Sequence, residues 1–340
     1  MSCLENPAVD PASVPPPSGE ARAFHESLPG YAPTPLRGLD AVAGELGLGA
    51  VALKDESDRL GLPAFKVLGA SWAVERALRE APDTHTLIAA SAGNHGRAVA
   101  HTAALRGLRC RVFLPARSAA ARREAIAGAG AEVVVVDGTY EEAVERAAAA
   151  AGEPGCLEVA DVGDSGPARW VIDGYATLFA EIAEEAEFDL ILVPIGVGSL
   201  GAAAARFGAS AGARVVGVEP VTAPCLSASL AAGRPTEVPT PGTTMAGLDC
   251  AEVSIGAWPV LQAGIHGTVT VSDDEVAAAI RELAAAGLAI GESGAAPLAA
   301  LRRMAAGYPE LGGLGPATRV VLIATEGPTN PESYRRAIDG

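Results

Sequence analysis

Lys66 is the residue with the most distinctive chemistry, because the 340-residue chain contains only one other lysine, Lys54. A neutral lysine amine can form a Schiff base, whereas an arginine guanidinium stays protonated. Lys66 follows Phe65 at the start of an apolar helical pattern, and apolar neighbours there favour the neutral amine. Lys54 lies in a run of charged residues, which predicts an ion-paired lysine. Lys66 is therefore the candidate nucleophile, and the alternative is a lysine that merely extends from a helix start.

Polar or glycine-rich sequences follow three predicted strands, at the strand ends where open α/β sheets bind their ligands. The segment 91–96, SAGNHG, opens a predicted helix, and its backbone N–H groups suit a carboxylate. The segment 194–201, PIGVGSLG, also leads into a helix and suits a phosphate. Thr325 follows the last strand, where its hydroxyl could face a heterocyclic nitrogen. Taken singly, these segments also fit simple helix caps and turns.

Taken together, these features predict one cofactor. A shielded lysine, a loop for a phosphate, a loop for a carboxylate and a polar strand end are the parts that hold pyridoxal 5′-phosphate as a Schiff base. Such a site needs rigid elements to position it, and the sequence supplies them as short apolar strands alternating with alanine-rich helices. This alternation predicts an α/β fold with mainly parallel sheets flanked by helices, and the number of strands favours two domains.

The predicted elements cover most of the chain after an N-terminal segment rich in proline and serine, residues 1–22, which we expect to be a loose arm. The predicted strands are 86–90, 110–114, 132–136, 157–160, 190–193, 215–218, 269–271 and 319–324. The predicted helices lie near 95–106, 119–129, 140–151, 170–187, 199–210, 273–287 and 294–307, with a last one starting near Pro331.

Composition and charge restrict the partners and the location. The formal net charge of −16 argues against nucleic acid and against anionic membrane surfaces. No apolar run approaches the roughly 20 residues of a membrane span, and the N-terminus lacks the pattern of a signal peptide. The five cysteines are widely spaced, which predicts reduced thiols and neither a metal site nor a disulfide framework. We therefore expect a cytoplasmic enzyme that acts on a small molecule.

Seven segments of the chain resemble one known family, the fold-type II pyridoxal-phosphate enzymes of the tryptophan synthase β superfamily. Within that family the chain is most similar to the diaminopropionate ammonia-lyase branch. The matching segments run from residue 24 to the C-terminus: FHESLPGYAPTPL, LKDESDRLGLPAFKVLGAS, AGNHGRAVA, IGVGSLGA, TTMAGLDCAE, GESGA and ATEGPTNPESYR. The resemblance implies a large phosphate-binding domain, 24–63 with 171–340, and a small mobile domain, 64–170, preceded by the arm, 1–23. Substrate binding closes the cleft between such domains, and the family commonly forms homodimers.

The resemblance also implies a role for individual residues. Lys66 would form the Schiff base and act as the general base, and Thr325 would face the pyridine nitrogen. Asn94 would contact the phenolic oxygen of the cofactor. The phosphate would be held by Gly196, Val197, Gly198, Ser199 and Leu200, and the substrate carboxylate by Ser91, Ala92, Gly93 and His95. Asp161 matches an acidic position of the ammonia-lyase branch and is the candidate proton donor to the leaving amine, with a helix cap or a structural ion pair as the alternative.

The activity that the resemblance implies is the α,β-elimination of ammonia from 2,3-diaminopropionate, which gives pyruvate and ammonia. The alternatives are a serine or threonine dehydratase, a β-replacement enzyme, and a protein that binds the cofactor without turnover. One position departs from the branch. Ala92 stands where ammonia-lyases of this branch carry an aspartate that serves as the base for the D-isomer, so we expect a preference for the L-isomer.

Overall fold

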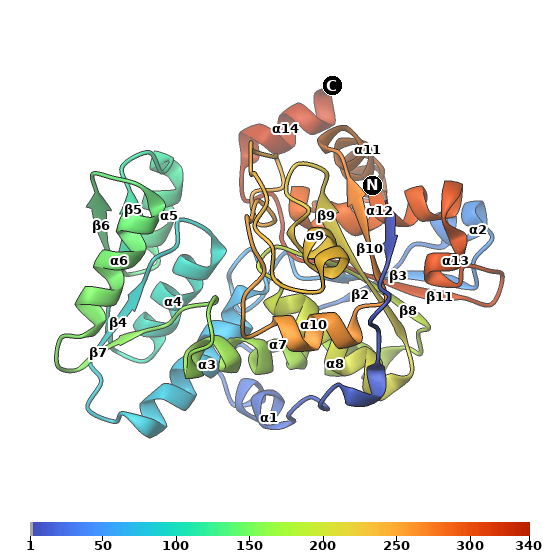
Figure 1. The fold of residues 1–340 in the computed structure, drawn as a ribbon. Helices are drawn as coiled ribbons and strands as arrows, with labels where there is room; N and C mark the ends of the chain where they lie inside the picture. The colour runs from blue at the N-terminus through green and yellow to red at the C-terminus, as the bar shows by residue number, and fades with distance from the viewer. Residues whose placement is uncertain (1–2) are drawn as a thin grey trace. The chain divides into compact units, whose positions relative to one another are not determined.

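The computed structural model describes residues 3–340, which divide into two compact units. Unit 1 consists of residues up to Phe65 together with Ala176–Gly340, and unit 2 of Lys66–Tyr175. Each unit is built on its own sheet with helices on both faces (Figure 1), which is the predicted α/β class with mainly parallel strands. None of the helices within residues 3–340 is long and apolar enough to cross a membrane.

The sheet of unit 1 has seven strands in the order β1-β10-β9-β8-β11-β3-β2. The five inner strands run parallel, and only β1 and β2 at the two edges are antiparallel to their neighbours. The strands are β1 (Cys3–Glu5), β2 (Leu36–Gly38), β3 (Ala50–Asp55), β8 (Leu190–Pro194), β9 (Arg214–Pro220), β10 (Gly267–Val271) and β11 (Arg319–Ala324). The inner strands are continuous apolar runs because both faces of this sheet are covered.

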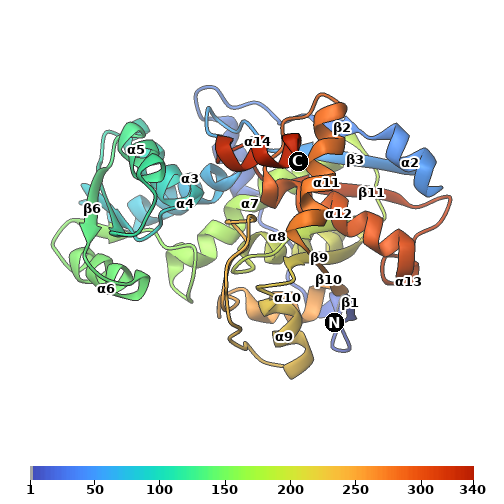
Figure 2. The ribbon, with the colours of Figure 1, turned by 90° about the horizontal axis from the view of Figure 1, so that it is seen from above.

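Helices cover the sheet of unit 1 on both faces. Alternate residues of the inner strands, such as Leu190 and Leu192, pack against α11 and α12, and α14 lies on α11 (Figure 2). On the other face α8 packs against β8 and β9, and α10 lies on α8 (Figure 1). The helices of unit 1 are α1 (Glu20–Glu26), α2 (Asp40–Leu46), α8 (Ser199–Ala211), α9 (Cys225–Ala232), α10 (Trp258–Gly264), α11 (Asp273–Ala285), α12 (Glu292–Gly307), α13 (Pro309–Gly312) and α14 (Pro331–Asp339), with the 3-10 helix η1 (Pro11–Ser13).

Unit 2 contains a four-stranded parallel sheet in the order β6-β5-β4-β7. One face, with Ile88 and Phe113, packs against α6, and α4 packs on the other, where Gly96 meets Val112. The strands are β4 (Thr86–Ala89), β5 (Arg109–Pro115), β6 (Glu132–Val136) and β7 (Cys156–Glu158). The helices are α3 (Lys66–Glu80), α4 (Asn94–Leu105), α5 (Ala120–Gly128) and α6 (Tyr140–Ala151), and α7 (Gly166–Glu185) begins in unit 2 and ends in unit 1.

The N-terminal segment differs from the loose arm that its composition predicts. Residues Cys3–Glu5 pair with β10, and the side chain of Asn6 donates hydrogen bonds to the carbonyls of Gln262 and Ile265 at 2.7 and 2.6 Å. Backbone pairing and a buried amide order this segment, and neither leaves a periodic apolar pattern in the sequence. Residues 1 and 2 of the predicted arm lie outside the described residues.

Candidate active site

Lys66 is the first residue of α3, where the chain enters unit 2. Its side chain is 22% exposed, and its Nζ donates a hydrogen bond to Oδ2 of Asp161 at 2.8 Å. The ring of Tyr175 lies 6.0 Å from this Nζ. Tyr175 comes close because α3 carries Gly69, where a side chain would lie only 2.5 Å from Cε1 of Tyr175. Small-residue packing between α3 and α7 thus places a buried aromatic ring beside the amine.

Asp161 follows β7, at the carboxyl edge of the unit 2 sheet, and its side chain is 19% exposed. Besides Lys66, its Oδ2 faces Nδ1 of His95 at 3.7 Å. Burial raises the pKa of Asp161, but the charges of His95 and Lys66 and the hydrogen bond from Lys66 outweigh it, so the pKa lies well below its usual range. Asp161 is therefore ionised at neutral pH and pairs with the lysine amine.

The segment 91–96 connects β4 to α4 at the same edge of the sheet. Ser91 Oγ accepts a hydrogen bond from Gly93 N at 3.3 Å, and Gly96 packs so closely that a Cβ there would lie 2.1 Å from the carbonyl oxygen of Ser91. His95 is buried and donates from Nε2 to the carbonyl of Val159 at 2.7 Å. Burial lowers the pKa of His95. The predicted residues Lys66, His95 and Asp161 therefore meet at one edge of unit 2, with Asn94 and Ala92 half-buried on the same loop.

The remaining predicted residues lie in unit 1, also at the carboxyl ends of neighbouring parallel strands. The segment Gly196–Leu200 follows β8, and Gly198, with φ +95°, precedes the first residue of α8. Gly198, the N-cap residue of this helix, has no side chain with which to cap it. A Cβ at Gly196 would lie 2.6 Å from the carbonyl of Gly247, so the loop requires glycine there. Thr325 is buried directly after β11, and its carbonyl accepts a hydrogen bond from Phe65 N at 3.2 Å.

Two features of these surroundings escaped the sequence analysis. Tyr175 lies in the middle of a helical pattern, and nothing in that pattern distinguishes it from a core residue. Glu181, also on α7, is the partner of the ion-paired Lys54, at 2.8 Å, which confirms that Lys54 is paired. The charged run around Lys54 signals a pair but does not identify a partner so distant in the sequence.

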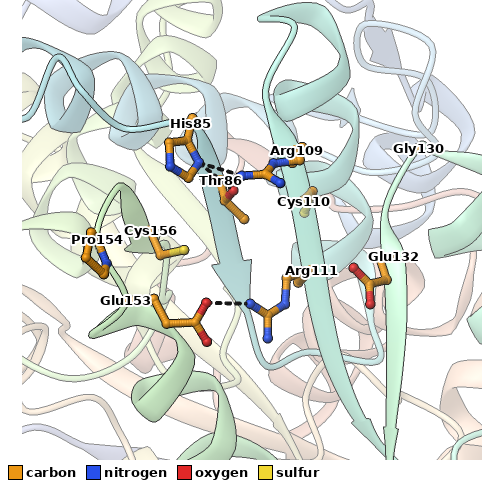
Figure 3. Close-up of a pocket in the computed structure, with 10 residues that line it drawn as sticks. All are labelled: His85, Thr86, Arg109, Cys110, Arg111, Gly130, Glu132, Glu153, Pro154 and Cys156. Atoms are coloured by element: carbon orange, nitrogen blue, oxygen red, sulfur yellow. Dashed lines mark hydrogen bonds and ion pairs between the residues drawn. The ribbon is translucent and has the colours of Figure 1, made fainter.

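Unit 2 also has a hollow of about 370 Å³ at the amino ends of its strands, the edge opposite to Asp161 (Figure 3). Arg111 pairs with Glu153 at 3.0 Å, and Arg109 contacts His85 at 2.9 Å. The lining residues are His85, Thr86, Arg109, Cys110, Arg111, Gly130, Glu132, Glu153, Pro154 and Cys156. Helices α5 and α6 end here, and arginines near helix C-termini offset the negative end of the helix dipole. We interpret the hollow as a structural feature of the sheet edge.

Comparisons with known proteins agree with this fold. The family described as pyridoxal-phosphate dependent enzyme matches residues 27–326. The diaminopropionate ammonia-lyase of Salmonella typhimurium is 33% identical over an alignment 363 residues long. The alignment covers 93% of this chain and 90% of that protein. The biosynthetic L-threonine dehydratase of Escherichia coli is 30% identical over 274 residues, which cover 79% of this chain and 52% of that protein.

A solved structure is similar over nearly the whole chain. It is the diaminopropionate ammonia lyase of Escherichia coli in complex with an aminoacrylate-PLP azomethine reaction intermediate. The TM-score is 0.91 with 29% sequence identity, and the match covers 99% of this chain and 96% of that one.

Proposed function

The chain belongs to the pyridoxal-phosphate dependent enzymes, and from this premise we propose that it eliminates ammonia from 2,3-diaminopropionate. One water is consumed, and pyruvate and two molecules of ammonia are formed. The observation that carries the proposal is the pair of Lys66 and Asp161 at 2.8 Å, which places a base and a carboxylate at one edge of unit 2. The similarity to diaminopropionate ammonia-lyases over 93% of the chain supports the choice of substrate.

The residues present fit the cofactor. Lys66 supplies the amine for the Schiff base, and the loop Gly196–Leu200 leads into a helix N-terminus that suits a phosphate. The left-handed φ of Gly198 and the close approach at Gly196 are the features of a loop that brings backbone N–H groups to an anion. Asn94 and Thr325 supply neutral polar groups for the phenolic oxygen and the ring nitrogen. We assign these four groups as the cofactor-binding residues.

The cofactor, when bound, supplies an electron sink that stabilises negative charge at Cα of the substrate. Lys66 then acts as the general base that removes the Cα proton. Asp161 is ionised, so it must receive a proton before it can donate one to the leaving β-amine. Lys66 Nζ, at 2.8 Å, is the group placed to supply that proton once it has taken the proton from Cα. Asp161 thus connects removal of the Cα proton to departure of the amine.

We propose a preference for the L-isomer because Ala92 offers no titratable atom on the loop where the ammonia-lyase branch carries an aspartate. Ser91, Gly93 and His95 of this loop are assigned to the substrate carboxylate site. The burial of His95 and its bond to Val159 support an indirect role for this residue, in which it orients Asp161 and the loop.

We further propose that unit 2 is the mobile small domain and that the protein is a cytoplasmic homodimer. Light scattering of the purified protein tests the dimer, for which we expect twice the mass of one chain.

The second candidate is a dehydratase acting on serine or threonine. It is favoured by the sequence Ser91-Ala92-Gly93-Asn94-His95, which resembles the dehydratase form of this loop, and by the similarity to threonine dehydratase.

Product ratios from the cofactor-loaded enzyme distinguish the candidates. Diaminopropionate yields two ammonia for each pyruvate, whereas serine yields one ammonia for each pyruvate and threonine one for each 2-oxobutanoate. Ammonia and the 2-oxo acid are therefore measured for L- and D-diaminopropionate, L-serine and L-threonine. We expect the fastest turnover and the 2:1 ratio with L-diaminopropionate. Faster release from serine would favour the dehydratase, and no release from any substrate would favour a protein that only binds the cofactor.

A further inference from the structure

Five buried side chains of unit 1 form one connected polar network, which we call the Arg59 network. Arg59 donates to Glu56 Oε2 from Nε at 2.8 Å and to both carboxylate oxygens of Glu181 at 2.7 and 2.8 Å. The hydroxyl of Thr34 accepts from Arg59 at 2.9 Å and donates to Glu56 at 2.6 Å. Lys54 binds Glu181 at 2.8 Å and the carbonyl of Thr34 at 2.6 Å. Arg59 therefore holds two carboxylates at once with a single rigid guanidinium.

Stability alone does not account for this network. Its two cations and two carboxylates are all at most 1% exposed, so their full desolvation cost is incurred. Burial raises the pKa of Glu181, but the hydrogen bonds and charges of Arg59 and Lys54 outweigh burial and lower the pKa to about 2. The charges of the network therefore persist at neutral pH. Apolar residues of similar volume are often as stabilising as a buried ion network, and fixed geometry is the property that apolar residues do not supply.

The network holds the two segments through which the chain leaves and re-enters unit 1. The chain passes into unit 2 after Phe65 and returns at Ala176. Glu56 and Arg59 precede the first crossing on the segment that follows β3, and Glu181 follows the second crossing on α7. One guanidinium thus joins the segment that carries Lys66 at its end to the helix that carries Tyr175.

The segment after Arg59 continues directly to the cofactor residues. Arg59 and Leu62 exchange backbone hydrogen bonds at 2.8 and 3.0 Å across a tight reversal, in which Leu60 adopts a φ of +53°. That conformation is unfavourable for a residue with a side chain, so it persists only where its surroundings fix it. Next, Pro63 accepts from Gly327 N at 3.1 Å, and Phe65 N donates to Thr325 O at 3.2 Å. The backbone of Thr325 and Gly327 is therefore bonded to the residues immediately before Lys66.

We propose that Arg59 is a positioning residue for Lys66, a role that rests on the proposed function. Through Glu56 and Glu181 it fixes the segments from which Lys66 and Tyr175 depart, and through the reversal at Leu60 it fixes the backbone of Thr325. Arg59 touches neither substrate nor cofactor. Its effect is exerted on the orientation of the lysine amine during proton transfer.

The first test is the variant Arg59→Lys, which keeps the charge but loses the fork that binds two carboxylates. With L-diaminopropionate and saturating cofactor we expect kcat to fall about 10²-fold, the effect of misplacing a reacting group by about 1 Å. KM should change less than about 3-fold, since substrate-binding residues are untouched. A loss of activity that appears in KM, or that excess cofactor restores, would overturn the proposal.

Arg302→Lys is the matched control. Arg302 also holds two carboxylates, Glu45 at 2.9 Å and Glu282 at 2.6 Å, but it lies on α12 with its side chain 32% exposed. We expect this variant to retain wild-type kcat. An equal fall of kcat in Arg302→Lys would show that the loss reflects general destabilisation.

Thr34→Val is the second variant, for use should Arg59→Lys fail to fold. It removes only the hydroxyl between Arg59 and Glu56, at nearly constant volume. We expect kcat to fall by about 10-fold or less while KM stays nearly unchanged.

The second test needs neither cofactor nor turnover. An amine-acylating reagent is applied to the cofactor-free protein, and labelling is followed for the peptide that contains Lys66, since the other native lysine, Lys54, is fully buried. Loss of positioning should weaken the pair with Asp161, so Lys66 should be labelled several-fold faster in Arg59→Lys than in wild type or Arg302→Lys. Unchanged labelling would refute the proposal even if diaminopropionate proves not to be the substrate.

Discussion

The two lysines of the chain occupy different environments, and this difference predicts which one carries the cofactor. Lys54 is fully buried and ion-paired with Glu181, whereas Lys66 is 22% exposed and faces Asp161. Borohydride reduction of the loaded enzyme should therefore fix the cofactor on the peptide that contains Lys66, and Lys66→Ala should abolish both the label and the yellow colour. Peptide mass spectrometry measures the site. A label on Lys54 would place the active site elsewhere.

Asp161 should matter more for an amine leaving group than for a hydroxyl that leaves in a side reaction. Asp161→Asn keeps the shape but cannot pass a proton from Lys66 to the leaving group. A positioned acid typically contributes about 10²–10⁴-fold, so we expect a loss of that order in kcat with L-diaminopropionate and a smaller loss with L-serine. Pyruvate release from both substrates is the measurement. Equal losses would reduce Asp161 to a structural partner of Lys66.

Ala92→Asp tests the preference between isomers. If the loop 91–96 places residue 92 as the resemblance implies, the added carboxylate should act as a base and raise turnover of D-diaminopropionate about 10²-fold or more, with the L-isomer nearly unchanged. Separate kcat values for the two isomers measure the effect. Comparable rates on both isomers in the wild type would instead show that another group, such as Asp161, already serves the D-isomer.

Individual residues differ in how far the sequence could have identified them. The rarity of lysine makes Lys66 the candidate nucleophile. Its hydrogen bond to Asp161 depends on β7 ending beside the loop of β4, an arrangement that parallel strands impose. Tyr175 and Arg59 escaped prediction because their partners lie far away in the sequence. A buried arginine looks like any other charged residue until its two carboxylates are placed around it.

At the scale of elements, α8 provides a comparison between its own two ends. Gly198 before its start and Gly212 after its end both have left-handed φ, +95° and +73°, but only Gly198 is crowded, by Leu261. Alanine at either position should cost about 1–2 kcal/mol of stability. Only Gly198→Ala should also weaken cofactor binding. Each 1.4 kcal/mol of binding free energy lost at the phosphate loop raises the dissociation constant about tenfold. Titration of cofactor-free protein, followed by absorbance, measures this, and equal weakening in Gly212→Ala would contradict the assignment of the loop.

Most of the long buried strands were predictable, but the inner strand β3 and the edge strands were not predicted. Strands β4–β6 and β8–β11 are apolar runs, and their sequences predict them to within about two residues at each end. Strands β1 and β2 at the sheet edges have little apolar sequence of their own. They form because an edge of the sheet offers backbone partners, which is a tertiary effect that local pattern does not record.

At the scale of the whole molecule, the pH dependence of stability should reveal one buried acid. Glu219 is the second-last residue of β9 and is fully buried. It accepts hydrogen bonds from Leu226 N at 2.6 Å and from Ser227 N and Oγ at 2.9 and 2.6 Å. Burial raises the pKa of Glu219 to about 7, against these hydrogen bonds, which lower it. Between pH 4.5 and 7 the folded protein therefore holds a proton that the unfolded chain has released.

The sign of the effect follows from that proton. This group stabilises the fold most below pH 4.5, and its contribution falls as pH rises to about 7, by on the order of 3 kcal/mol in total. Glu219→Gln removes the titration, so the free energy of unfolding of the variant minus that of wild type should increase between pH 5 and pH 8, whatever constant cost the lost hydrogen bonds add. Denaturant unfolding at the two pH values measures it, with Glu80→Gln on the exposed end of α3 as the control. If the difference in free energy of unfolding does not change with pH, Glu219 is ionised throughout this range. The three hydrogen-bond donors would then lower its pKa by more than burial raises it.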